Sequence, residues 1–202
     1  LYLLRSDLKG NLIIQTRMDP ETPSQAVQAK RLPRAYLTAF AYGIDKVFWY
    51  NLRAFETSDT DPESHFGILH SNFTQKPAYV AYKVLTQMCP DGSTRPSWKH
   101  QGFVYQTTWQ RPDGKYVSAL WTAGAQQKIH LSMVGQSSLT NHLGVAVTPE
   151  DSSATGINLT VTSGPIYVVS DGEIPTFNVV ETGIQHVSSN ENPVKSNQIC
   201  QT

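Results

Sequence analysis

Residues 45–53 read Asp-Lys-Val-Phe-Trp-Tyr-Asn-Leu-Arg, and this stretch decides the predicted fold. Its apolar centre, residues 47–50, is typical of a strand buried on both faces of a parallel sheet. The strand ends in aromatic and polar side chains of the kind that line a sugar site. A helical pattern that stops at Gly43 precedes it, and a helix beginning at Lys76-Pro77 follows it. Helix, strand, loop and helix in this order predict a parallel α/β fold.

The two helices on either side of this strand are predicted from apolar spacing and from their end signals. The first begins at residues 23–24, Pro-Ser, and Pro33 inside it is expected to kink or divide it. The second spans residues 76–88 and stops at Cys-Pro-Asp-Gly, residues 89–92. Between them, residues 54–64 form a polar, acidic loop.

Beyond Pro96 the pattern changes to short strands separated by turns. The turn Arg-Pro-Asp-Gly at residues 111–114 separates two alternating stretches and predicts a hairpin. Short strands of this kind predict an antiparallel sandwich or a small barrel. The further strands are expected at residues 103–108, 116–121, 129–134, 139–147, 157–161 and 165–169.

Composition excludes several classes of function. The chain has 202 residues, of which 39% are hydrophobic, and its 16 basic and 16 acidic residues cancel. The sequence contains no basic stripe of the kind that would indicate a nucleic-acid partner. It also contains no apolar run long enough for a membrane span. The two cysteines, Cys89 and Cys200, have no metal-ligand spacing, so we expect no zinc site, no other metal or cofactor, and two free thiols.

Four stretches resemble the end of a (β/α)8 glycoside hydrolase of clan A, nearest to the family 39 and family 5 types. They are residues 34–37 (Arg-Ala-Tyr-Leu), 42–50 (Tyr-Gly-Ile-Asp-Lys-Val-Phe-Trp-Tyr), 65–69 (His-Phe-Gly-Ile-Leu) and 76–82 (Lys-Pro-Ala-Tyr-Val-Ala-Tyr). Residues 113–121, 140–144 and 164–168 resemble the accessory β-sandwich that follows the barrel in many such enzymes. The tail, residues 188–195, is similar to the junction before a cell-surface sorting domain in secreted Bacteroidetes proteins.

The resemblance implies a fold class of α/β plus all-β, in three parts. Residues 1–92 are expected to be the C-terminal portion of a (β/α)8 TIM barrel: residues 23–42 match helix seven, 46–50 strand eight and 76–88 helix eight. Residues 93–181 are expected to form the antiparallel β-sandwich, and residues 182–202 a linker or tail. The missing N-terminal part of the barrel, in the same protein, is then an expected partner.

Retaining glycosidases need two carboxylates about 5–5.5 Å apart, which the clan carries on strands four and seven. On this mapping strand four is absent, and strand seven lies before or at the very start of the chain. We therefore assign no catalytic residue and expect the isolated chain to be inactive. Glu56 and Glu63 share one loop, which is a poor scaffold for such a pair.

Candidate substrate-binding residues lie at and beyond the end of the strand, each with a structural alternative. Trp49 either stacks on a sugar ring or lies in the core. Asn51, on the same face by strand alternation, either binds a hydroxyl or forms a turn. Arg53 and His65 either line the mouth of the site or make loop salt bridges.

Three functions remain open at this point. The leading one is the C-terminal segment of a secreted or cell-surface glycoside hydrolase that acts on a polysaccharide or oligosaccharide by the retaining mechanism. The second is a non-catalytic carbohydrate-binding module, which an exposed row of aromatic residues on a sheet would favour. The third is a scaffold domain at the cell surface.

Overall fold

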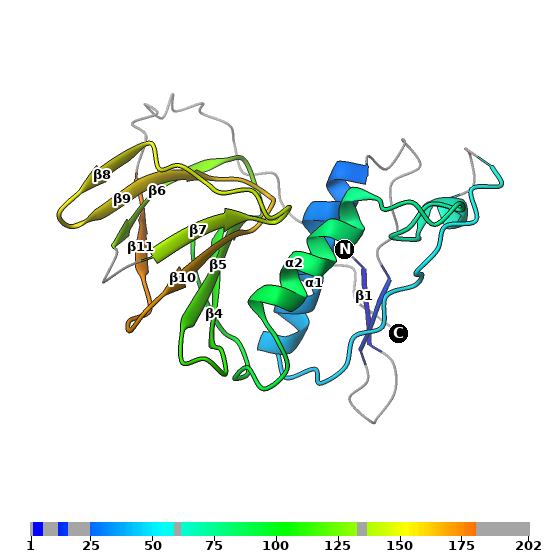
Figure 1. Cartoon of the computed structure of the whole chain (residues 1–202), viewed down its shortest axis with the longest axis horizontal. Coiled ribbons are helices and arrows are strands. Elements are labelled where there is room, and N and C mark those ends of the chain that lie inside the picture. The colour runs from blue at the N-terminus through cyan, green and yellow to red at the C-terminus, as the bar shows by residue number, and fades with distance from the viewer. Residues whose placement is uncertain (1, 6–11, 16–24, 59–61, 133–136, 181–202) are drawn as a thin grey trace, which may run out of the picture.

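The computed structural model describes residues 2–5, 12–15, 25–58, 62–132 and 137–180. Within them, a two-sheet β-sandwich lies on one side of a pair of helices, and an elongated connection and a small hairpin lie on the other (Figure 1). The predicted tail, Cys200 and the predicted helix start at residues 23–24 lie outside the described residues.

The hairpin at the N-terminus consists of β1 (Tyr2–Arg5) and β2 (Leu12–Gln15). The two strands are antiparallel, and Tyr2 pairs with Gln15. This pairing differs from the parallel pairing of barrel strands.

Helix α1 (Gln25–Ala41) continues through Pro33, so the expectation that proline divides this helix is wrong. Proline removes one backbone hydrogen bond, but Pro33 lies on the buried side of the helix, where Leu32 and Leu37 are fully buried. Tertiary packing therefore offsets the lost bond.

The predicted stop of this helix at Gly43 is confirmed. The Gly43 N–H donates to the Phe40 carbonyl and the Ile44 N–H to the Ala39 carbonyl, both at 3.0 Å. This is the Schellman arrangement, and it requires the left-handed conformation that Gly43 has at φ +87°.

Helix α2 (Pro77–Met88) packs against α1, and proline occupies its first turn as the sequence indicates. A 3-10 helix, η1 (Pro62–His65), lies in the connection between the two helices. Both α-helices bury small and aliphatic residues in one hydrophobic cluster, which includes Ala29, Leu32, Ala78, Ala81 and Leu85.

The sandwich has two antiparallel sheets. The five-stranded sheet has the order β3 (Ser97–Gln101), β4 (Val104–Gln110), β5 (Tyr116–Thr122), β10 (Ile166–Ser170) and β7 (Ser137–Asn141). The four-stranded sheet has the order β11 (Thr176–Val179), β6 (Gln127–Ser132), β9 (Gly156–Val161) and β8 (Asp151–Ser153).

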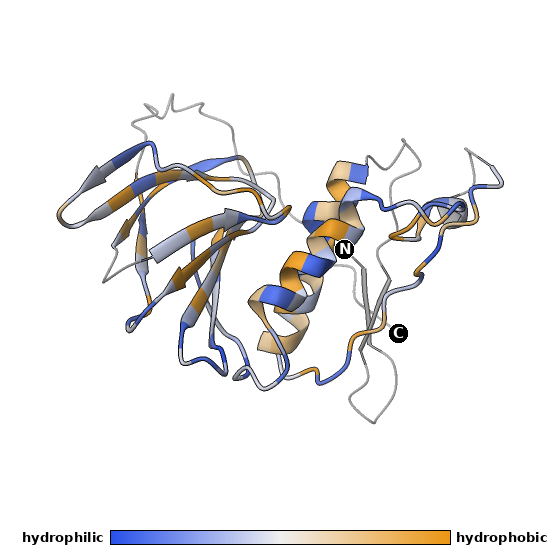
Figure 2. Cartoon of the chain, in the orientation of Figure 1, coloured by the Kyte–Doolittle hydropathy of each residue, from blue (hydrophilic) through white to orange (hydrophobic). Residues whose placement is uncertain are grey.

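The central strands β5 and β10 of the five-stranded sheet are buried on both faces. One face contributes Trp109, Val117 and Tyr167 to the cluster shared with the helices. The other contributes Leu120 and Val168 to a second cluster inside the sandwich. Hydrophobic residues accordingly run along the strands and along the facing sides of the helices (Figure 2). The predicted antiparallel sandwich is therefore observed, and it is packed directly onto the helices.

Three strands of the sandwich were not predicted: β3, β8 and β11. All five residues of β3 and all three of β8 are exposed, so neither carries the alternation of buried and polar residues that identifies a strand. The helix pair and the antiparallel sheets are thus established, whereas the barrel portion and the domain boundary at residue 92 stay predictions.

Candidate functional site

Residues 44–50, here called the connecting segment, form no strand ladder with any described part of the chain, so the predicted parallel strand at 46–50 is not observed. Their side chains nevertheless alternate. Val47 and Trp49 pack on the helix cluster, whereas Phe48 is 87% and Tyr50 65% exposed. The segment is therefore covered on one face only, which corrects the prediction of burial on both faces.

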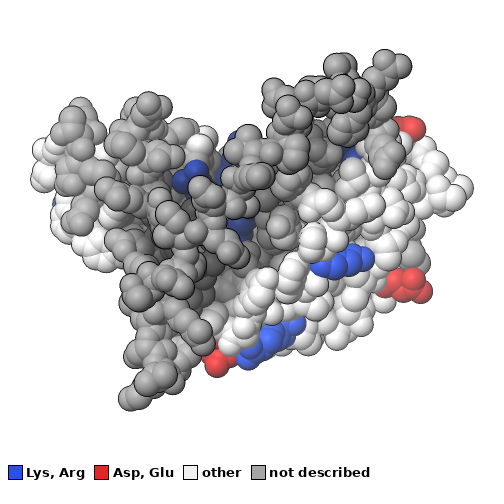
Figure 3. Space-filling model, turned by 180° about the vertical axis from the view of Figure 1, so that it is seen from behind, with Lys and Arg blue, Asp and Glu red and all other residues white. Residues whose placement is uncertain are grey.

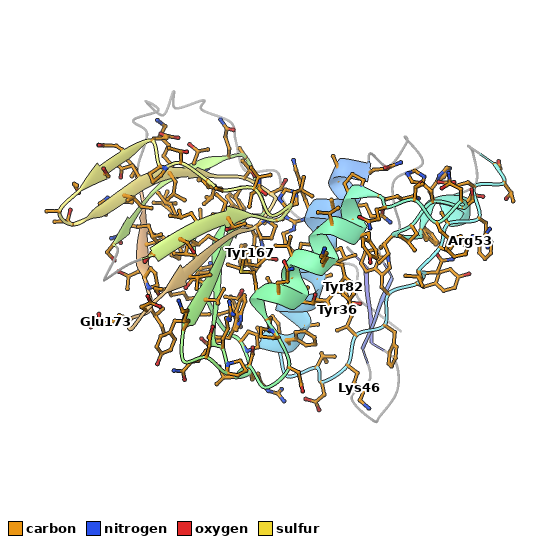
Figure 4. All side chains as sticks on the ribbon, in the orientation of Figure 1. Tyr36, Lys46, Arg53, Tyr82, Tyr167 and Glu173 are labelled. Atoms are coloured by element: carbon orange, nitrogen blue, oxygen red, sulfur yellow. The ribbon has the colours of Figure 1, made fainter. Side chains whose placement is uncertain are left out.

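Trp49 lies on the covered face. Its indole N–H donates to the Phe66 carbonyl at 3.2 Å, and its backbone is hydrogen-bonded to the phenol of Tyr36. Tyr36 in turn contacts Tyr82 of α2, with ring centroids 5.3 Å apart, and Figure 4 shows the two tyrosines on neighbouring helices. Burial raises the pKa of Tyr36 well above its ordinary value. These contacts hold Trp49 against the helices and the loop. Its predicted role in stacking on a sugar ring stays a prediction.

The rings that face away from the helices are those of Phe48 and Tyr50, which the sequence reasoning did not name as site residues. Tyr50 makes an edge-on contact with Phe66, with centroids 6.3 Å apart. Strand alternation was the signal that could have found them: once Trp49 is placed on the helices, its two neighbours must point the other way.

Asn51 follows the connecting segment, and the peptide bond between Tyr50 and Asn51 is cis. The Asn51 carbonyl accepts the Ile68 N–H at 3.2 Å. Its side-chain Oδ1 is buried and has no hydrogen-bond partner among the described residues. A buried amide oxygen without a partner is uncommon, because most buried polar atoms are hydrogen-bonded.

Arg53 and His65 make contacts within the loop. The Arg53 Nε donates to the Ser71 carbonyl at 2.8 Å, and its guanidinium lies 4.6 Å from the centre of the Phe73 ring. The carbonyl of His65, at the end of η1, accepts from Lys76 Nζ at 3.3 Å. The four predicted substrate-binding residues therefore occupy one end of the connecting segment and the loop after it, but no contact joins their side chains. Their roles toward a substrate stay predictions.

Glu56, which the sequence analysis rejected as half of a catalytic pair, organises this loop. Glu56 accepts hydrogen bonds from the Ser71 N–H at 3.0 Å and the Ser71 hydroxyl at 2.8 Å. Its other oxygen lies 2.7 Å from His70 Nδ1 and 3.7 Å from the Nζ of Lys76, whose side chain is 2% exposed. The backbone N–H of Ser71, with help from the Ser71 hydroxyl and His70, lowers the pKa of Glu56 to about 2.

These contacts determine what the loop can do chemically. A carboxyl group with so low a pKa stays ionised, which suits an anchor for the loop and not a general acid. Burial lowers the pKa of Lys76, and the attraction of Glu56 opposes this shift. Among the described residues, no three His, Cys, Asp or Glu side chains gather closely enough to hold a metal ion.

Charged residues are few among the described atoms on the face opposite to that of Figure 1 (Figure 3). Figure 3 shows isolated basic and acidic residues on the face opposite to that of Figure 1, without a patch of one sign in that view. The described helices include none with the length and hydropathy needed to cross a bilayer.

Comparison with solved structures finds a similar fold in parts of glycoside hydrolases. The chain is similar to a family 39 glycoside hydrolase from the gut symbiont Bacteroides cellulosilyticus WH2, with a TM-score of 0.64 and 21% sequence identity over 74% of this chain. It is also similar to the catalytic domain of the GH30 xylanase C from Talaromyces cellulolyticus, with a TM-score of 0.52 and 13% identity over 74% of this chain.

These matches cover 31% and 36% of the two solved chains, so the chain corresponds to about a third of each enzyme's length. No protein-family model and no curated protein sequence matches the chain. At these identities the likeness concerns the fold. The chain thus shares the fold of about a third of each of these two enzymes.

Proposed function

We propose that this chain is the C-terminal part of a secreted or cell-surface glycoside hydrolase of clan A, acting on a polysaccharide or oligosaccharide. In this proposal α1 and α2 are the last two helices of a (β/α)8 barrel, and the connecting segment supplies its eighth strand. The sandwich is the accessory domain. The rest of the barrel belongs to the same protein.

The observation that carries the proposal is the one-sided burial of the connecting segment. Val47 and Trp49 face the helices, and Phe48 and Tyr50 face outward with most of their surface exposed. A barrel strand has this arrangement, with alternate side chains directed to the helix layer and to the barrel interior. The similarity to two glycoside hydrolases, over a third of their length, supports the same interpretation.

The same arrangement suggests which residues meet the substrate. Active sites of such barrels lie at the carboxyl ends of the strands. Here that end carries Tyr50 and Asn51, and the loop beyond it is held by Glu56. We infer that Tyr50 offers a ring for stacking and that the unpaired Oδ1 of Asn51 accepts a hydrogen bond from a sugar hydroxyl. In this proposal Trp49, Arg53 and His65 surround these two residues and support the mouth of the site.

The catalytic carboxylates belong to the remainder of the protein in this proposal. A nucleophile and an acid/base about 5–5.5 Å apart would carry out a double displacement through a glycosyl-enzyme intermediate. This chain's contribution is to position the sugar, which requires no cofactor.

The test starts with the native protein. Intact mass and gel analysis should find this sequence together with an N-terminal barrel portion, and that material should hydrolyse aryl glycosides. Replacing Asn51 by alanine should lower kcat/KM about tenfold, as expected for the loss of one well-formed hydrogen bond. Val145→Ala, at an exposed position in the sandwich, is the matched control and should leave hydrolysis unchanged.

Two results would overturn the proposal. One is a native protein that contains only this chain, folded and monomeric. The other is a complete protein that hydrolyses none of a panel of aryl glycosides while its carboxylates and fold are intact.

The second candidate function is a non-catalytic carbohydrate-binding or cell-surface scaffold domain. One observation favours binding: rings from β3, β4 and β5 form a continuous row on one face of the five-stranded sheet. This row lies away from Asn51, so binding there is compatible with the leading proposal.

A further inference from the structure

A row of aromatic side chains crosses the five-stranded sheet and ends at its exposed edge. Trp121 of β5, 5% exposed, stacks on Tyr105 of β4 with ring centroids 5.9 Å apart and planes inclined by 9°. Tyr105 stacks on His100 of β3 at 5.5 Å, and His100 stacks on Trp98 at 5.6 Å. Tyr42, just beyond α1, completes the row against Trp98 at 5.4 Å.

The row begins in the core and ends in solvent because the helices cover only part of this face. Trp121 and Tyr105 belong to the cluster beneath α1 and α2. Trp98 is 39% and Tyr42 64% exposed, and His100 is exposed as well. Exposed aromatic rings held by their neighbours form a rigid surface, and such surfaces in monomeric proteins are often binding sites.

We propose that Tyr42, Trp98 and His100 form a second carbohydrate-binding surface, separate from the barrel mouth, which takes the pyranose rings of a glycan chain. The choice of ligand class rests on the proposed function, because the fold is shared with glycoside hydrolases. The placement of the surface rests only on the contacts of this chain.

The chemistry of these three residues suits a sugar. A pyranose presents C–H groups on its faces, which pack against aromatic rings, and hydroxyls at its rim, which need polar partners. The phenol of Tyr42 and the Nε2 atom of His100 supply polar atoms beside the ring of Trp98, while His100 Nδ1 lies 3.2 Å from the Gly102 carbonyl oxygen. The nearby charges of Arg95 and Asp45 neutralise one another in an ion pair of 2.7 Å. Lys99 points to the opposite face of the sheet, where it lies over Phe177.

A protein strand added to the edge of the sheet is a less suitable occupant. Strand β3 is the edge strand, and Lys99 and His100 stand in its middle. Polar and charged residues at such positions are a recognised defence against strand addition.

This surface and the barrel mouth lie at opposite ends of the connecting segment. Tyr42 precedes residues 44–50, and Asn51 follows them. If fully extended, six residue steps span roughly 20 Å. Figure 4 shows this separation through Lys46, near the first end, and Arg53, beyond the second. A glycan bound at Trp98 would therefore anchor the protein to its substrate without entering the catalytic cleft.

The test uses the full chain and three soluble polysaccharides, xylan, hydroxyethyl cellulose and galactomannan, in affinity electrophoresis and in titrations followed by tryptophan fluorescence. Retardation and a saturable fluorescence change are expected with at least one of them. Trp98→Ala should weaken this binding about tenfold or more, and Tyr42→Ala by several-fold. Phe73→Ala, 62% exposed but distant from the row, is the matched control and should bind as the unchanged chain does.

Tyr42→Ala also guards against a folding defect, because Tyr42 lies outside the sheet and its loss leaves β3 intact. Trp98→Phe should restore part of the binding. The inference is overturned if the folded chain binds none of the three polysaccharides, or if it binds one with unchanged affinity in both alanine variants. Polysaccharide binding by a protein without hydrolytic activity would contradict the proposed glycoside hydrolase function. It would still support the carbohydrate-binding surface at Trp98.

Discussion

At the scale of single residues, the side chain of Glu56 stabilises the polar loop that follows the connecting segment. Its two oxygens meet the N–H and hydroxyl of Ser71, the imidazole of His70 and the ammonium of Lys76. Glu56 itself has φ +52°, a left-handed conformation that is uncommon outside glycine. The contacts of one side chain therefore stabilise an unfavourable backbone position and close the loop.

Replacing Glu56 by glutamine should weaken the loop by about 1–3 kcal/mol at neutral pH, because charge-assisted hydrogen bonds are lost. The pKa of Glu56 is lowered in the folded protein to about 2, so its contribution is complete above its ordinary pKa of 4.5. That contribution is lost as the pH falls from 4.5 through about 2. The free energies of unfolding of wild type and variant should therefore converge over this interval.

Hydrogen exchange of the Ser71 amide and thermal unfolding between pH 2 and 7 measure this effect. Glu173→Gln is the control, since Glu173 lies in an exposed turn at the far end of the sandwich (Figure 4). A difference between wild type and the Glu56 variant that stays constant with pH would contradict the assignment.

At the scale of elements, the loop after the connecting segment is aligned by backbone pairing. Leu69 donates to the Leu52 carbonyl at 2.8 Å and accepts from the Ala54 N–H at 2.9 Å. Gly67 makes this approach possible, because a Cβ at that position would lie 1.9 Å from the Ala54 nitrogen. The absence of a side chain at residue 67 thus determines where Asn51 and Arg53 are held.

Gly67→Ala should therefore separate the two segments and cost more than about 3 kcal/mol, a penalty typical of a forced backbone shift. The amides of Ala54 and Ile68 should exchange faster with solvent. Gly124→Ala is the matched control, since a Cβ there would contact only the Phe103 side chain, at 3.4 Å. Thermal unfolding of both variants tests this, and equal stabilities would show that the loop adapts to a side chain.

Helices and strands were predictable from the sequence where a turn residue, a helix-end residue or apolar spacing marks them locally. One end of each helix follows from the sequence: Gly43 predicts where α1 ends, and Pro77 predicts where α2 begins. The backbone preferences of glycine and proline act without tertiary contacts. Strands β4 and β5 are marked by the turn between them at residues 111–114. Strand β3 has no signal of its own, because it exists through pairing with β4. The residues that carry the second proposed surface were therefore missed.

At the scale of the whole molecule, the helices are covered unequally on their two sides. One side packs on the five-stranded sheet, with Trp109 donating to the Met88 carbonyl at 2.8 Å. On the other side the connecting segment packs Val47 and Trp49 against the helix cluster and leaves the side chains of Phe48 and Tyr50 exposed. Apolar rings exposed in a row predict that a further part of the protein packs there.

The variant Phe48→Asp distinguishes a Phe48 that stays exposed to solvent from a Phe48 that a further part of the protein covers. In the isolated chain the change should alter the free energy of unfolding by less than about 0.5 kcal/mol, because the side chain is already 87% exposed. In the complete protein it should place a charge in the barrel and abolish activity. Phe103→Asp, 66% exposed in the turn between β3 and β4, should leave both quantities unchanged.

Calorimetry of the chain and hydrolysis assays of the complete protein give the two readouts. Full activity of Phe48→Asp would contradict the placement of the connecting segment in a barrel.

The sequence by itself determined the helix pair, the hairpin turns and the antiparallel sandwich, because glycine, proline and apolar spacing act through local backbone preferences. It also indicated an extended stretch at residues 47–50, but the predicted burial of that stretch on both faces was wrong. Only the tertiary structure decided that Trp49 faces the helices, that Glu56 anchors the loop and that an aromatic row reaches the edge of the sheet. These are contacts between residues far apart in the chain, and the direction of a side chain depends on which neighbours are present to bury it.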